Sequence, residues 1–189
     1  SDKVTFDSAL RSILRHDPDV VMVGEIRDLP TADIALKAAL TGHLVFSSLH
    51  TNTAIGAVTR LMDFGCEPYL VSATLVGAIS QRLVRRLCHA CREEVDVDDA
   101  NRALLGDHEL KRHFKSVGCP QCLGTGYSGR IGLFECFWTG EETRELISNG
   151  AAEHEISRVG GDLHKTMFRD GLDKVSLGLT SLEEVIAVT

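Results

Sequence analysis

The sequence predicts an α/β protein: a parallel sheet with flanking helices, an inserted cysteine-rich metal module and a C-terminal helical cap. Three observations predict this fold class. Helix-like and strand-like segments alternate through residues 1–87. Two cysteine pairs lie among many glycines in residues 88–133. Helical patterns return in residues 134–189. We expect these three ranges to be the domains of the chain.

The composition is that of a soluble globular protein, with 43% hydrophobic and 25% charged residues among 189. The net charge of −7 disfavours wrapping around nucleic acid or binding an anionic membrane directly. Six cysteines without a secretory leader indicate a reducing compartment. The chain begins at Ser1 without an initiator methionine, so we expect it to be part of a longer protein.

The first predicted helix has Thr5 as its N-cap and ends before Pro18. Its apolar positions recur at helical spacing and are Phe6, Leu10, Ile13 and Leu14. The apolar run Val20–Val23 follows, which is typical of a strand buried on both faces.

Alternation of the two kinds of element continues after this strand. We expect a helix over 31–40, a strand over 44–46 and helices over 53–64 and 67–87. The last of these helices would carry three arginines near its end, Arg82, Arg85 and Arg86. In the tail, residues 180–184 predict a helix start with a Ser or Thr cap.

Polar side chains follow both predicted strands. Glu25 comes after the first strand, and His50 comes after the second, close to Ser47 and Ser48. The carboxyl ends of parallel strands share one rim of the sheet, where ligands bind, so we expect Glu25 and His50 to be neighbours. The alternatives are that Glu25 caps the following helix and that His50 is structural. His43 opens the second strand, so it is expected at the opposite end or against a neighbouring subunit.

The cysteine pairs have the spacing of a metal site. Cys88 and Cys91 form one pair, and Cys119 and Cys122 form the other, with a long loop between the pairs. Four thiolates can enclose one tetrahedral Zn²⁺, and a closed site of this kind is structural rather than catalytic. The alternative is two disulfides.

The remaining patterns of cysteine, glycine and histidine are weaker indicators of function. Residues 119–126 fit the C-x-x-C-x-G-x-G pattern of J-domain co-chaperones, but in a single copy, and the acidic loop disfavours a nucleic-acid finger. Cys66 and Cys136 are expected to be small buried apolar residues. We expect the dispersed histidines to lie at the surface; they are His108, His113, His154 and His164.

Four segments in order resemble one protein family, the type II secretion and type IV pilus assembly ATPases of the secretion ATPase E type. ILRHDPDVVMVGEIRD at 13–28 resembles their Walker B region, and TGHLVFSSLHTN at 41–52 resembles their His box. QRLVRRLC at 81–88 and the segment 119–132 resemble the entry and exit of their tetracysteine zinc module. The resemblance covers nearly the whole chain.

The resemblance implies a RecA-like P-loop NTPase core in a homo-hexamer that hydrolyses ATP with Mg²⁺. Such rings lie at the cytoplasmic face of the inner membrane, contact inner-membrane secretion or pilus platform proteins and bind no specific nucleic acid. Glu25 would be the Walker B glutamate, and His43 and His50 would lie near the phosphates and subunit contacts. Arg130, near the adenine, and Arg27 are the expected nucleotide-binding residues.

The chain departs from the family pattern in one respect: it has no G-x-x-x-x-G-K-[ST] sequence. That loop supplies the backbone N–H groups and the lysine that hold the β and γ phosphates. The chain therefore resembles the C-terminal half of the motor domain, and we predict that it does not hydrolyse ATP alone. The alternative is a zinc-stabilised interaction module without catalysis. Pilus retraction motors fit less well, because as a rule they lack the tetracysteine module.

Overall fold

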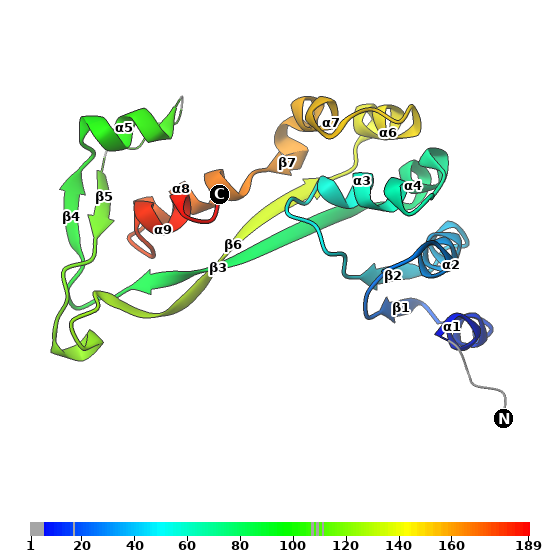
Figure 1. Ribbon diagram of the computed structural model, residues 1–189, viewed down its shortest axis with the longest axis horizontal. Helices are drawn as coiled ribbons and strands as arrows, with labels where there is room; N and C mark the ends of the chain where they lie inside the picture. The colour runs from blue at the N-terminus through cyan, green and yellow to red at the C-terminus, as the bar shows by residue number, and fades with distance from the viewer. Residues whose placement is uncertain (1–5, 17, 107, 109, 111) are drawn as a thin grey trace. The chain divides into compact units, whose positions relative to one another are not determined.

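A computed structural model describes residues 6–189 apart from residues 17, 107, 109 and 111 (Figure 1). The predicted cap Thr5 lies outside the described residues. The chain forms two compact units. Unit 1 comprises the residues up to Ala78 together with Phe137–His164, and unit 2 comprises Ile79–Cys136 and Lys165–Thr189. Each unit has its own hydrophobic core.

Unit 1 contains the parallel strand pair that the sequence predicts. Strand β1 (Val20–Val23) pairs with β2 (Leu44–Ser47) in parallel, and Val23 lies opposite Ser47. The helices of this unit are α1 (Phe6–Leu14), α2 (Leu29–Leu40), α3 (Gly56–Asp63), α4 (Pro68–Thr74), α6 (Glu141–Ser148) and α7 (Glu153–Gly160), followed by the short η2 (Gly161–Leu163). Two parallel strands need a long crossover connection, which is usually a helix, and α2 is the helix between β1 and β2.

Helix α2 connects the two strands, and residues at its ends explain where it begins and ends. The Asp28 carboxylate accepts a hydrogen bond from the Thr31 backbone N–H at 3.0 Å, which satisfies one free donor at the helix start. Pro30 lies in the first turn, where its missing N–H costs nothing. Gly42 follows the helix with a φ of 101°, a conformation that glycine adopts without strain.

The strand pair buries only one face. Val21 and Val23 are buried in the core of unit 1, whereas Val20 is exposed and Met22 is 81% exposed. The expectation of a strand buried on both faces is therefore wrong for the described residues. Buried and exposed residues alternate because successive side chains of a strand point to opposite faces of the sheet. The helices of unit 1 pack on the face that carries Val21 and Val23.

The predicted helix over 67–87 is the main error of the sequence analysis. Helix α4 ends at Thr74, and residues Gly77–Leu87 form the long strand β3 instead. The three arginines expected on a helix end lie on this strand. Gly77 packs closely: a Cβ there would lie 2.5 Å from Trp138 Cε3 and 2.8 Å from the Phe137 carbonyl oxygen. Pairing with a distant segment decided the conformation, which local periodicity does not reveal.

That partner segment is β6 (Tyr127–Trp138), and the sheet order is β3-β6-β7, with β7 being His164–Lys165. Helical structure was expected from residue 134, but it begins at Glu141 because β6 continues to Trp138. Both long strands contribute residues to each unit.

Unit 2 holds the cysteine-rich segment and the tail. Its β4 (Glu93–Asp96) pairs antiparallel with β5 (Arg112–Lys115). The remaining elements are α5 (Asp99–Leu105), η1 (Pro120–Cys122), α8 (Met167–Ser176) and α9 (Leu182–Ile186). The predicted helix start near residue 181 is confirmed, although no side chain caps it. The Thr180 hydroxyl instead donates to the Arg85 carbonyl oxygen at 2.8 Å.

His113 was expected at the surface, and this expectation is wrong, because its side chain is only 4% exposed. It lies on β5, against which α8 and α9 pack. Its Nδ1 has no hydrogen-bond partner among the described residues.

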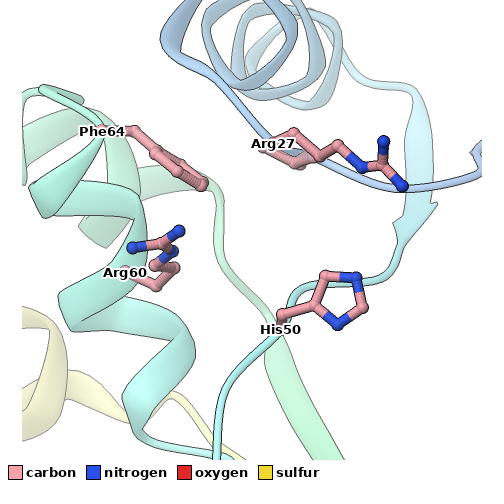
Figure 2. A pocket seen from close by; sticks show the side chains of 5 residues that line it. Arg27, His50, Arg60 and Phe64 are labelled. Atoms are coloured by element: carbon pink, nitrogen blue, oxygen red, sulfur yellow. The ribbon is translucent and has the colours of Figure 1, made fainter.

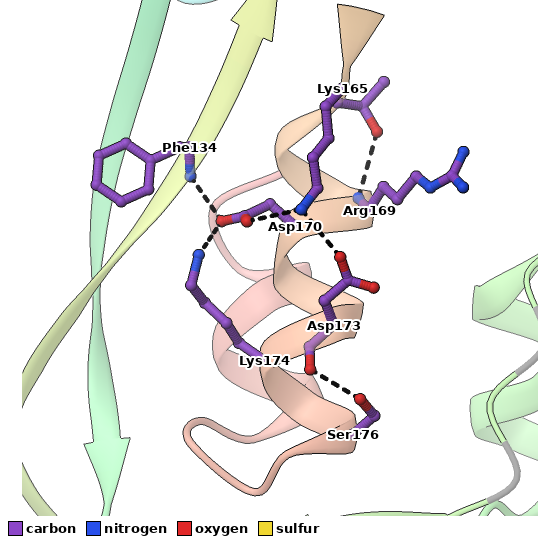
Figure 3. A network of polar contacts seen from close by, with 8 residues as sticks. Phe134, Lys165, Arg169, Asp170, Asp173, Lys174 and Ser176 are labelled. Carbon is purple, nitrogen blue, oxygen red and sulfur yellow. Dashed lines mark hydrogen bonds and ion pairs between the residues drawn. The ribbon is translucent and has the colours of Figure 1, made fainter. Parts of the chain in front are cut away.

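Asp170 anchors α8 to β6 within unit 2 (Figure 3). Its carboxylate accepts the Phe134 backbone N–H at 2.9 Å and pairs with the ammonium groups of Lys165 at 3.1 Å and of Lys174. Only 9% of Asp170 is exposed. A buried carboxylate needs such partners, so the tail helix is held to the strand by charge as well as by packing.

Candidate functional site

The structure brings Glu25 and His50 together at one rim of the parallel strand pair. His50 Nε2 lies 3.2 Å from Glu25 Oε2, and Arg27 Nη2 lies 2.6 Å from Glu25 Oε1. Each oxygen of the carboxylate therefore has its own nitrogen partner. We call Glu25, Arg27 and His50 the strand-end site.

Backbone contacts between the two strand ends hold this geometry. The Ile26 N–H donates to the Ser48 carbonyl oxygen at 3.0 Å, and the Ser48 hydroxyl donates to the Gly24 carbonyl oxygen at 2.8 Å. These bonds continue the pairing of β1 and β2 beyond the last strand residues. They fix the segment that carries Glu25 beside the segment that carries His50.

The electrostatics favour a charged carboxylate at this rim. The hydrogen bond from Arg27 is the largest influence and lowers the pKa of Glu25. Desolvation opposes it, and the contact with His50 lowers the pKa further. Glu25 is therefore an acceptor at neutral pH. The alternative in which Glu25 caps the next helix is wrong, because Asp28 is the N-cap of α2.

His43 lies apart from the carboxylate, and Arg130 belongs to the other unit. His43 precedes β2, at the end opposite to His50, and its Nδ1 lies 3.0 Å from the Ala38 carbonyl oxygen and 3.2 Å from the Thr41 hydroxyl. These contacts place it beside the C-terminal end of α2, and its position at the opposite end of the strand is one of the two that the sequence predicted. Arg130 is exposed on β6 in unit 2.

Two further residues, which the sequence analysis missed, line a pocket with Arg27 and His50 of the strand-end site (Figure 2). Arg60 and Phe64 come from the α3 segment, and they line a pocket of ≈ 410 Å³ with Arg27, His50 and Ile26. The Arg60 guanidinium lies 4.5 Å from the centre of the Phe64 ring. Their spacing of four residues predicts a shared helix face, but nothing in the sequence directs that face to this rim.

The four paired cysteines converge in unit 2, and their sulfur atoms all lie within 4.8 Å of one another. We call Cys88, Cys91, Cys119 and Cys122 the cysteine cluster. The Sγ atoms of Cys88 and Cys119 are 3.9 Å apart, and those of Cys91 and Cys122 are 3.8 Å apart. Four sulfurs at about 2.3 Å from one tetrahedral ion stand about 3.8 Å apart, so the cluster fits a metal. All four are free thiols, which does not support the alternative of two disulfides.

The second cysteine pair is supported by backbone donors. The N–H groups of Cys119 and Gly126 lie 3.2 Å and 3.1 Å from Cys122 Sγ. Burial opposes the thiolate, but these donors and the neighbouring thiols outweigh it and lower the pKa of Cys122 to about 6. Burial raises the pKa of Cys91 to about 12.

Known proteins resemble the chain in sequence over nearly its whole length. The profile of the family described as type II/IV secretion system protein matches residues 1–187. The chain belongs to this family. The type II secretion system ATPase E of Vibrio cholerae is 51% identical over 98% of the chain. The type IV pilus assembly ATPase PilB of Thermus thermophilus is 48% identical over the same share.

The fold of the chain is also similar to that of a solved structure. The pilus retraction motor PilT with bound ADP superposes with a TM-score of 0.70 at 30% identity, over the whole of this chain and 45% of that one. The chain spans only 37% of the Vibrio cholerae relative and 22% of PilB. Among the described residues, no helix is long and apolar enough to cross a membrane.

Proposed function

We propose that this chain is the C-terminal part of an ATPase motor domain that powers type II protein secretion or type IV pilus assembly. The observation that carries the proposal is the contact between Glu25 and His50 at the carboxyl ends of two parallel strands. In α/β proteins this rim is where ligands bind. Membership of the secretion family, whose relatives include ATPases, supports the same conclusion.

Glu25 has the central role in the proposed chemistry. Arg27 and His50 each hold one oxygen of its carboxylate, so the group is charged and fixed in orientation. A carboxylate in this position can hold Mg²⁺ through water or orient the water that attacks a phosphate. His50 positions Glu25 when its proton is on Nε2. Arg27 would add positive charge near a bound phosphate.

The cysteine cluster has a structural role in this proposal. Cys88, Cys91, Cys119 and Cys122 would hold Zn²⁺, which supplies cross-linking and no catalysis in a closed four-thiolate site. The metal would fasten both ends of the segment that contains β4, α5 and β5.

The assembly follows from the family resemblance. We infer a homo-hexamer at the cytoplasmic face of the inner membrane, which contacts the membrane through secretion or pilus platform proteins. Arg130 and His43 would act at the nucleotide or subunit contacts of that ring. The 189 residues have no phosphate-binding loop, so we infer that they do not hydrolyse ATP by themselves.

A chimera tests the proposal. The matching part of the Vibrio cholerae ATPase is replaced by these 189 residues, and ATP turnover is measured with and without Glu25→Gln. We expect Glu25→Gln to lower kcat by about 100-fold or more, because the amide keeps the shape but loses the charge.

Glu67→Gln is the matched control, since Glu67 is an exposed acid of the same unit without a side-chain cap contact, and turnover should be unchanged. If the chimera and its Glu25→Gln variant turned over ATP at the same rate, the role given to Glu25 would be contradicted. ATP turnover by the 189 residues alone, above that of their Glu25→Gln variant, would contradict the predicted inactivity.

A further inference from the structure

One glycine contacts both halves of the cysteine cluster. The Gly126 N–H donates to Cys122 Sγ at 3.1 Å, and the Gly126 carbonyl oxygen accepts the Cys88 N–H at 2.9 Å. Cys88 belongs to the first pair and Cys122 to the second, and the pairs are far apart in sequence. A single peptide segment therefore sets the distance between them.

Only glycine fits this position. Gly126 has a φ of 76°, and a Cβ there would lie 2.5 Å from Ser116 Cβ and 3.1 Å from Ser116 Cα. The backbone of residue 116 is thus in close contact with residue 126. A methyl group would push the two segments apart, and the segment after Ser116 leads directly into Cys119.

The same loop contains a glycine that lacks this restriction. Gly124 has a φ of 79°, and an added Cβ would meet nothing within 4 Å. Its N–H donates to the Cys119 carbonyl oxygen, not to a sulfur. Gly124 and Gly126 therefore share the left-handed conformation and differ in packing and in the contact with the ligand.

We propose that Gly126 is a positioning residue of the metal centre, which sets the spacing of the two cysteine pairs before the ion binds. The N–H to sulfur bond orients Cys122, and the carbonyl contact holds the start of the first pair. When a group that hydrogen-bonds to a metal ligand is lost, the metal commonly binds about 10- to 100-fold more weakly. This inference rests on the proposed zinc site.

The test measures the Zn²⁺ affinity of the 189-residue chain by competition with a chromogenic chelator under reducing conditions. We expect Gly126→Ala to bind Zn²⁺ at least about 10-fold more weakly than Gly124→Ala. Both variants carry the cost of a left-handed alanine, so their ratio reports the lost positioning. The Co²⁺-loaded proteins supply a second readout, because the absorption of cobalt bound to four thiolates should be altered in Gly126→Ala alone.

Equal affinities and equal cobalt spectra for the two variants would overturn the inference. A wild-type chain that binds no Zn²⁺ would instead overturn the zinc proposal, so the two failures are distinct. A double variant covers the case in which Gly126→Ala fails to fold. Ser116→Gly with Gly126→Ala removes the 2.5 Å contact and should regain affinity relative to Gly126→Ala. Absence of any recovery would also overturn the inference.

Discussion

At the residue scale, Asp170 shows how a charged group can stabilise the fold. Its carboxylate accepts one backbone N–H and pairs with Lys165 and Lys174, and Lys174 is itself only 17% exposed. Lys174 would lose its carboxylate partner if the negative charge were lost, whereas Lys165 would keep Asp173. The stability of unit 2 should therefore depend on the ionised form of this one residue.

We predict that Asp170→Asn lowers the free energy of unfolding by about 2–3 kcal/mol, because it leaves a largely buried ammonium group without its counter-ion. Asp173→Asn is the control, since Asp173 pairs with Lys165 from an exposed position and should cost under about 1 kcal/mol. Urea denaturation of both variants checks the difference. Equal costs would contradict the role given to Asp170.

The same residue predicts a pH dependence. Burial opposes ionisation, but Lys174, the Phe134 N–H and Lys165 outweigh it and lower the pKa of Asp170 below its ordinary 3.8. The charged form therefore stabilises the fold above about pH 4, and this contribution is lost as the pH falls through the lowered pKa. The stability gap between wild type and Asp170→Asn, measured by urea denaturation, should shrink below pH 4. A gap that stays constant would contradict this assignment.

At this scale the sequence predicted which cysteines lie together better than it predicted their surroundings. Cys88, Cys91, Cys119 and Cys122 were grouped by spacing alone, because two pairs of cysteines with two residues between the members of each pair are typical of a metal site. The pairing of Glu25 with His50 followed from strand order. Gly126 was not predicted as a partner of the cysteines, because its role depends on contact with Ser116, which the sequence does not show.

At the element scale, strand β3 replaces a helix that the sequence favours. The decisive contacts are distant: Gly77 lies against Phe137 and Trp138, which are about sixty residues away along the chain. Apolar runs without clear alternation fit either structure, and the long partner strand decides between them. The Ala-rich helix over 31–40 was predicted correctly as α2, although its Asp28 cap was not predicted.

Gly77→Ala should therefore destabilise the start of β3. The added methyl group would lie 2.5 Å from Trp138 Cε3 and 2.8 Å from a backbone oxygen, and such overpacking costs about 1–3 kcal/mol. Trp138 is the single tryptophan, so its fluorescence reports this contact directly during urea denaturation. Gly24→Ala is the control, because a Cβ there meets nothing within 4 Å, and its stability should be unchanged or slightly higher. A Gly77→Ala chain as stable as wild type would contradict the packing described.

At the scale of the whole molecule, the two units separate the proposed chemistry from the proposed metal site. Unit 1 contains the strand-end site, and unit 2 contains the cysteine cluster, each with its own core. The strand-end site should therefore keep its structure when the metal is lost. The sequence analysis assigned the two sites to different ranges, 1–87 and 88–133, but it did not predict that strands β3 and β6 contribute to both units.

Metal removal should act locally. Binding of structural zinc is coupled to folding with a free energy on the order of 10 kcal/mol, so a chelator should first unfold the segment around β4 and β5. Hydrogen exchange followed by mass spectrometry should show lost protection there and retained protection in β1 and β2. Simultaneous loss of protection in both units would contradict independent cores.

Metal content is the most direct test of the central claim, which is that two distant cysteine pairs enclose one ion. The 189-residue chain is purified under reducing conditions without chelators, beside its Cys88→Ser variant, and both are analysed by mass spectrometry for metals. The account predicts one zinc per wild-type chain and a marked loss in the variant. A wild-type chain without metal, or a variant that retains the full amount, would contradict it.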